Sequence, residues 1–92
     1  SAVGAHLLNA TQRGDCELFY WRANNREVDF ILRSSKKLVA IEVKSARRRD
    51  AMPGMEAFAE AFRPQRCLLV GGDGVPLGTF LSTPVGKWLD QK

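Results

Sequence analysis

Short apolar segments separated by polar turns predict the secondary structure of the first half of the chain. Residues 2–12 carry apolar side chains along one stripe, so we expect a helix there. Residues 18–22 are rich in aromatic side chains and predict a strand, and Asn24-Asn25 predict a tight turn after it. Residues 26–33 and 38–44 predict two more strands. Because the connections are short, these three strands should form an antiparallel meander.

The second half of the chain predicts a helix followed by further strands. Pro53 suits a first helical turn, and apolar residues recur at helical spacing over residues 53–62. Residues 66–70 predict a buried strand, which the helical crossover should place parallel to its neighbour. Residues 78–82 predict a weaker strand, and Pro84 starts a short terminal helix. We therefore expect an α/β (α+β) fold, with a mixed central sheet flanked by helices.

A hairpin between residues 26–33 and 38–44 would bring their apolar side chains onto one side. If residues 34–37 close this hairpin, Phe30 faces Ile41 and Val28 faces Val43. That side is wholly apolar and must face the core, and a slip of one residue would destroy the match. A tighter two-residue turn within 34–37 keeps the same register.

The other side of this hairpin carries charge. The same register sets Asp29 opposite Glu42 and Glu27 opposite Lys44, with β-carbons about 5 Å apart. Two facing acids destabilise a sheet unless a cation lies between them, and carboxylate oxygens suit Mg²⁺ or Mn²⁺. An ammonium at Lys44 could orient a water or stabilise charge on a phosphate. The alternative is a solvent-facing strand end with a Glu27–Lys44 ion pair and two tolerated acids.

Composition favours a small domain with a bias toward anionic partners. The 92 residues suffice for one core, and no apolar run is long enough to span a membrane. The net charge of +4 is partly concentrated in three arginines, Arg47, Arg48 and Arg49. Such a run can contact the phosphates of a nucleic acid, or it can be a solvated loop. Cys16 and Cys67 lack zinc-ligand spacing and are expected to be reduced thiols.

Asp29, followed after an apolar run by Glu42-Val43-Lys44, resembles the signature of the PD-(D/E)xK nucleases, which include Holliday-junction resolvases and many restriction enzymes. The resemblance implies a restriction-endonuclease-like fold in which Asp29 and Glu42 bind Mg²⁺ and Lys44 is the catalytic lysine. Val28 replaces the usual proline without removing a ligand. These nucleases commonly add an acid from the first helix, but residues 2–12 contain none, and we expect His6 to be structural.

Further motifs give a resemblance that covers nearly the whole chain. They lie, in order, at residues 3–9, 18–22, 27–30, 41–45, 69–71 and 84–89. Together they resemble the domain of unknown function that ends many prokaryotic AAA-type ATPases. The resemblance implies a cytoplasmic protein whose ATP-binding module lies upstream, and this chain contains no Walker motif. We therefore expect residues 1–92 to be one nuclease-like domain, a C-terminal fragment of a longer ATPase.

Three functions follow as alternatives. The first is a metal-dependent nuclease or nucleic-acid-processing domain, in which the arginine run holds the phosphates of DNA or another nucleic acid. The second is a catalytically silent binding or regulatory module that docks on its own ATPase, on nucleic acid or on another protein. The third is a packing domain of the ATPase. The first requires the two acids to meet, and the others do not.

Overall fold

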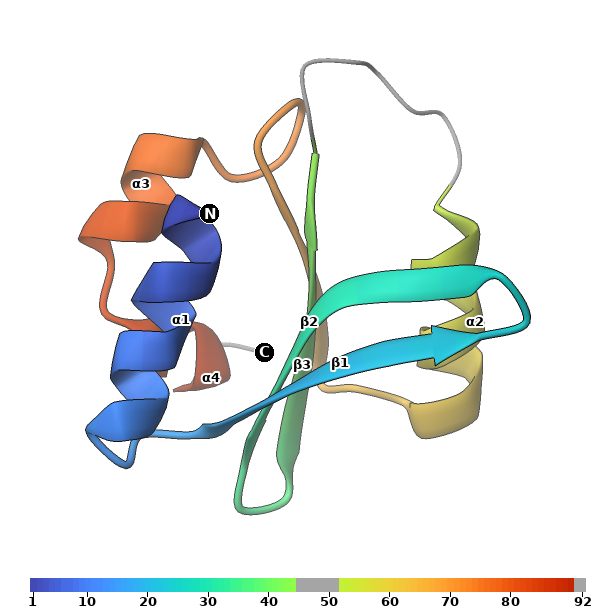
Figure 1. Cartoon of the computed structure of the whole chain (residues 1–92), viewed down its shortest axis with the longest axis horizontal. Helices are drawn as coiled ribbons and strands as arrows, with labels where there is room; N and C mark the ends of the chain where they lie inside the picture. The colour runs from blue at the N-terminus through green and yellow to red at the C-terminus, as the bar shows by residue number, and fades with distance from the viewer. Residues whose placement is uncertain (45–51, 91–92) are drawn as a thin grey trace.

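The computed structural model describes residues 1–44 and 52–90, which form an α+β domain with one four-stranded mixed sheet (Figure 1). Along the chain the elements are α1 (Ala2–Gln12), β1 (Glu17–Ala23), β2 (Arg26–Ser34), β3 (Lys37–Val43), α2 (Pro53–Phe62), β4 (Arg66–Val70), α3 (Leu77–Ser82) and α4 (Val85–Asp90). The strand order is β1-β2-β3-β4. The first three strands are antiparallel, and β4 runs parallel to β3, as the crossover through α2 predicts.

The two hairpin turns have the backbone geometry that short connections require. Asn24 and Asn25 both adopt positive φ, at 52° and 63°, which asparagine tolerates better than most residues. The hairpin of β2 and β3 closes on the pair Ser34↔Lys37, leaving a two-residue turn with Ser35 at φ 58°. The predicted register is confirmed from this turn to the pair Phe30↔Ile41.

The strand predicted at residues 78–82 is wrong, because this segment lies within helix α3. The chain after β4 makes only an isolated bridge between Val70 and Val75 before it leaves the sheet. The helix instead buries Phe80 completely, with its ring stacked on Trp88 at 5.6 Å between centroids. Burial of a large aromatic side chain therefore outweighs the local preference of this segment for extended backbone.

Core side chains cover both faces of the sheet. One face packs against α1, α3 and α4 through a large cluster that includes Leu7, Leu32 and Ile41. The other face packs against α2 through a smaller cluster that includes Ile31 and Phe58. Figure 1 shows α2 on the opposite side of the sheet from the three other helices. The side of the sheet that carries the acids is therefore not solvent-facing throughout, because α2 covers part of it.

A β-bulge interrupts β2 next to the predicted acids. Phe19 pairs with Ile31, but Trp21 pairs with Val28, so β2 has one more residue than β1 in this interval. The extra residue changes the phase of the strand. Val28 consequently joins the α2 cluster instead of facing Val43 on the other side, as the uninterrupted register had predicted.

Candidate functional site: a carboxylate pair at the bulge

The structure brings Asp29 and Glu42 together at the point where β2 and β3 separate. The ladder ends at Phe30↔Ile41, and two side chains continue the contact between the strands. Asp29 Oδ2 accepts a hydrogen bond from the Val43 backbone N–H at 2.8 Å. Glu42 Oε1 accepts one from the Asp29 backbone N–H at 3.1 Å. Each carboxylate therefore accepts a hydrogen bond from the backbone of the neighbouring strand.

This exchange gives the two acids a structural role. The β2–β3 ladder ends at Phe30↔Ile41, so the Asp29 and Val43 N–H groups beyond it need another acceptor where they are partly buried. The carboxylates of Asp29 and Glu42 supply these acceptors, and the bonds fix the orientation of both side chains. Hydrogen bonds from N–H groups to a carboxylate are charge-assisted, which helps to hold two like charges close together.

The carboxylate pair opens into a polar cleft of about 330 Å³. The cleft is lined by Asn25, Arg26, Glu27, Asp29, Glu42, Pro53 and Gly54. The first turn of α2 closes one side, and it can do so only because residue 54 is glycine. A Cβ at Gly54 would lie 1.9 Å from the carbonyl oxygen of Glu27, well inside contact distance. The sequence shows Pro-Gly at this helix start, but only the fold shows what the glycine meets.

Lys44 lies at a different place from the one predicted. Its Nζ is 3.8 Å from Asp73 in the turn after β4, and its stem packs over Gly72. The side chain is only 8% exposed, and Lys44 is not among the residues that line the carboxylate cleft. The Glu27–Lys44 ion pair of the alternative interpretation is absent from the described residues, where Glu27 Oε1 instead lies 3.9 Å from Arg22 Nε.

The cause is the parallel pairing of β3 with β4. Carboxyl ends of parallel strands meet at one edge of a sheet, so the end of β3 neighbours the turn that follows β4. The Lys44 backbone N–H accordingly donates to the carbonyl of Val70 at 2.8 Å. The sequence analysis did not predict that the turn after β4 would lie beside Lys44. The predicted parallel pairing of the two strands was the signal that could have indicated it.

The donor set at the cleft suits a hard divalent cation better than zinc. Within residues 1–44 and 52–90 no three His, Cys, Asp or Glu side chains are grouped so as to hold a metal ion. Zinc sites use three or four protein ligands, whereas Mg²⁺ commonly binds one or two carboxylates and completes its shell with water or phosphate oxygens. Asp29 and Glu42 meet that smaller requirement. The predicted phosphate contacts Arg47, Arg48 and Arg49 lie outside the described residues.

The remaining candidate groups have structural surroundings. The His6 Nε2 is 3.0 Å from the Thr83 carbonyl, and its ring meets the Phe80 ring edge to face, as expected for a structural histidine. Cys16 and Cys67 are free thiols, and burial raises the pKa of both. In the described part of the chain, no helix is long and apolar enough to cross a membrane.

The fold defines a small α+β domain with a four-stranded mixed sheet and helices on both faces. The sequence matches the family described as Domain of unknown function (DUF4143) over residues 1–84, and the chain belongs to this family. Domains of this family are typically found with AAA ATPases. No curated protein and no solved structure matches the chain.

Proposed function

We propose that this domain is a nuclease-like module of an AAA-type ATPase that uses Mg²⁺ or Mn²⁺ to hydrolyse phosphodiester bonds in DNA or another nucleic acid. The observation that supports this most directly is the convergence of Asp29 and Glu42 on one polar cleft, each oriented by a backbone N–H of the opposite strand. ATP would be bound only by the ATPase module.

In this proposal each residue has a distinct task. Asp29 and Glu42 are the cation ligands, and the bound ion would polarise a phosphate and lower the pKa of a bound water. Lys44, whose Nζ lies 3.8 Å from Asp73 and outside the cleft, would turn toward the bound phosphate to stabilise its charge. The arginine run at residues 47–49 would contact flanking phosphates.

Amide substitutions test the cation site without removing its structural hydrogen bonds. Asp29→Asn and Glu42→Gln keep an oxygen that can accept from the opposite strand, but they remove the charge that a hard cation needs. We expect each variant to bind Mn²⁺ at least tenfold more weakly than the unchanged chain, measured by electron paramagnetic resonance. Glu60→Gln removes an exposed acid elsewhere on α2 and should leave Mn²⁺ affinity unchanged.

Cleavage assays then separate a cation site from a nuclease. Single-stranded and duplex DNA and RNA would be incubated with the protein joined to its ATPase, with Mg²⁺, Mn²⁺ or EDTA. The nuclease proposal expects cleavage that needs the cation and disappears in Asp29→Asn and in Lys44→Met. Equal Mn²⁺ affinity in Asp29→Asn, Glu42→Gln and Glu60→Gln would refute the metal site. Cation binding without any cleavage would refute the catalytic step alone.

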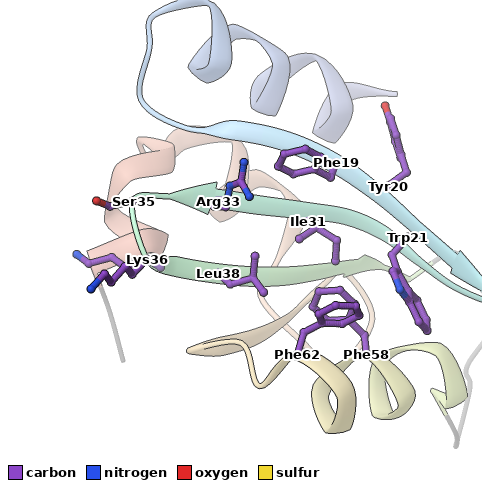
Figure 2. Close-up of a pocket in the computed structure, with 11 residues that line it drawn as sticks. Phe19, Tyr20, Trp21, Ile31, Arg33, Ser35, Lys36, Leu38, Phe58 and Phe62 are labelled. Carbon is purple, nitrogen blue, oxygen red and sulfur yellow. The ribbon is translucent and has the colours of Figure 1, made fainter.

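A second candidate is a catalytically silent module that docks on its ATPase or on another protein. The observation that favours it is a large apolar groove on the α2 face of the sheet, with several exposed aromatic side chains (Figure 2). Exposed apolar surface of this kind commonly marks an interaction site. Retention of partner binding in Asp29→Asn, together with no cleavage by the unchanged protein, would favour this candidate.

A further inference from the structure

The C-terminal half of α2 and the sheet beneath it form a groove of about 390 Å³, which we call the aromatic groove (Figure 2). Its apolar lining consists of Phe19 and Trp21 from β1, Ile31 from β2, Leu38 from β3, and Phe58 and Phe62 from α2. The volume lies within the roughly 300–1,000 Å³ usual for ligand pockets. The carboxylate cleft lies at the other end of α2, so the two sites are separate.

The aromatic groove remains exposed because α2 covers only part of its side of the sheet. Phe62 is 52% exposed and Phe19 is 40% exposed, which is unusual for two large aromatic side chains next to a core cluster. Helix α2 packs mainly on β2 and to a lesser extent on β3, and it meets β1 through Trp21, so it covers β1 only in part on this side. On the opposite face three helices pack over the sheet, as Figure 1 shows.

This geometry fits a helix better than an extended strand. The groove is formed by side chains on the face of three neighbouring strands and by the flank of α2, not by the backbone edge of β1. A helix laid there would pack beside α2 at about 8–10 Å between axes, the usual distance for neighbouring helices. It would complete the second layer of helices on the sheet.

The charged residues around the groove indicate the sign of the charge that its occupant should carry. Arg33, Lys36 and Lys37 line it, and no Asp or Glu of the described chain does so. Arg33 and Lys37 form ion pairs with Glu17 and Asp90, but all four side chains are about half exposed or more. Such pairs exchange at little cost, so the three cations can face acids on a partner.

The aromatic rings are arranged for apolar side chains more than for nucleotide bases. Trp21 meets Phe58 edge to face at 5.5 Å between centroids, and it meets Phe62 edge to face at 6.3 Å. Phe58 and Phe62 are tilted by 30° at 4.7 Å between centroids, so these three rings pack on one another instead of standing apart as open platforms on which bases stack. Ile31 and Leu38 add aliphatic surface beside them. This lining suits leucine or phenylalanine anchors.

We propose that the aromatic groove binds an acidic amphipathic helix of a partner protein. The helix would insert apolar side chains spaced i, i+3 or i+4, and i+7 between β1 and α2. Its acidic residues would lie near the β2–β3 turn, where Lys36 stands at one end of the groove (Figure 2). The proposal does not depend on the carboxylate pair, so either can fail without the other.

Synthetic helical peptides test this proposal directly. The probe is a fluorescein-labelled peptide of about four turns, with leucine and phenylalanine at the anchor positions and glutamate on the flanks. Its counterpart has lysine in place of every glutamate. By fluorescence anisotropy with the full chain, we expect the acidic peptide to bind with a Kd on the order of 10–100 µM. The lysine peptide should bind at least tenfold more weakly.

Two variants with matched controls locate the binding. Phe62→Ser should lower the affinity for the acidic peptide at least tenfold. Because Phe62 is half exposed, this variant should still fold, as circular dichroism would verify. Lys36→Glu should weaken it several-fold, and more so at low salt. Leu8→Ser removes an equally exposed apolar side chain from α1, and Lys87→Glu reverses an exposed charge on α4, and both should bind like the unchanged chain.

Several outcomes would overturn the proposal. The first is no binding of the acidic peptide at millimolar concentration, and the second is equal binding of the acidic and lysine peptides. A third is tight binding of a single-stranded thymidine oligonucleotide that falls steeply with salt and is lost in Phe62→Ser, which would assign the groove to nucleic acid. A fourth is self-association of the chain that Phe62→Ser abolishes, which would assign the groove to a second copy.

Discussion

Replacing Asp29 by alanine should destabilise the domain through a hydrogen bond that the isosteric asparagine preserves. Asp29 Oδ2 accepts from the Val43 N–H at 2.8 Å in a partly buried position. A hydrogen bond to a charged group contributes about 1.5–3 kcal/mol, and partial exposure lets water replace some of it. Relief of repulsion from Glu42 offsets a further part. We therefore expect Asp29→Ala to cost about 1–2 kcal/mol, and Asp29→Asn less than about 0.5 kcal/mol.

Urea unfolding followed by circular dichroism measures this difference. With an m value of about 1 kcal/mol/M, the midpoint of Asp29→Ala should fall by about 1–2 M, while that of Asp29→Asn should stay close to the unchanged chain. Equal midpoints for the two variants would show that the carboxylate does not hold β3 at the bulge. Both unfolding curves should be recorded in EDTA, so that cation binding does not contribute to the measured stability.

Four further predictions concern the cation site, two glycines and the two thiols. Addition of 10 mM Mg²⁺ should stabilise the unchanged chain by about 1.4 kcal/mol if the Kd is near 1 mM, and should not stabilise Asp29→Asn; equal stabilisation of both would argue against the cation site. Gly54→Ala should cost more than about 3 kcal/mol, because its Cβ would overlap the Glu27 carbonyl, whereas Gly78→Ala, with nothing within 4 Å of its Cβ, should be neutral or stabilise α3 by up to about 1 kcal/mol in the same urea assay. Because burial raises the pKa of both thiols, alkylation by iodoacetamide should stay slower than that of free cysteine near pH 8 and should accelerate at a higher pH than free cysteine does, with Cys67 ahead of buried Cys16. A faster alkylation of Cys16 than of Cys67 would contradict the burial argument. The same raised pKa values imply that the free energy of unfolding keeps its full value below the ordinary thiol pKa and falls as the pH rises through the folded-state pKa values.

The hairpin of β2 and β3 shows how far register reasoning reaches. From the polar turn to Phe30↔Ile41, every pair follows from matching apolar residues on both strands. The same register predicts that Asp29 lies next to Glu42, and their hydrogen bond confirms it. The bulge cannot be predicted from these two strands, because the extra residue is decided by the pairing of β2 with β1. The bulge replaced a face-to-face acid pair with two acids that each bind the opposite backbone.

Most elements of this domain, the parallel placement of β4 and the proximity of the two acids could be predicted from the amino-acid sequence. Those features depend on local periodicity and on short connections, which a linear pattern contains. Three features could not be predicted without the folded domain: the helix at residues 78–82, the position of Lys44 beside Asp73, and the groove next to α2. These outcomes depend on which faces remain to be buried and on which strand ends meet, and both are properties of the assembled sheet.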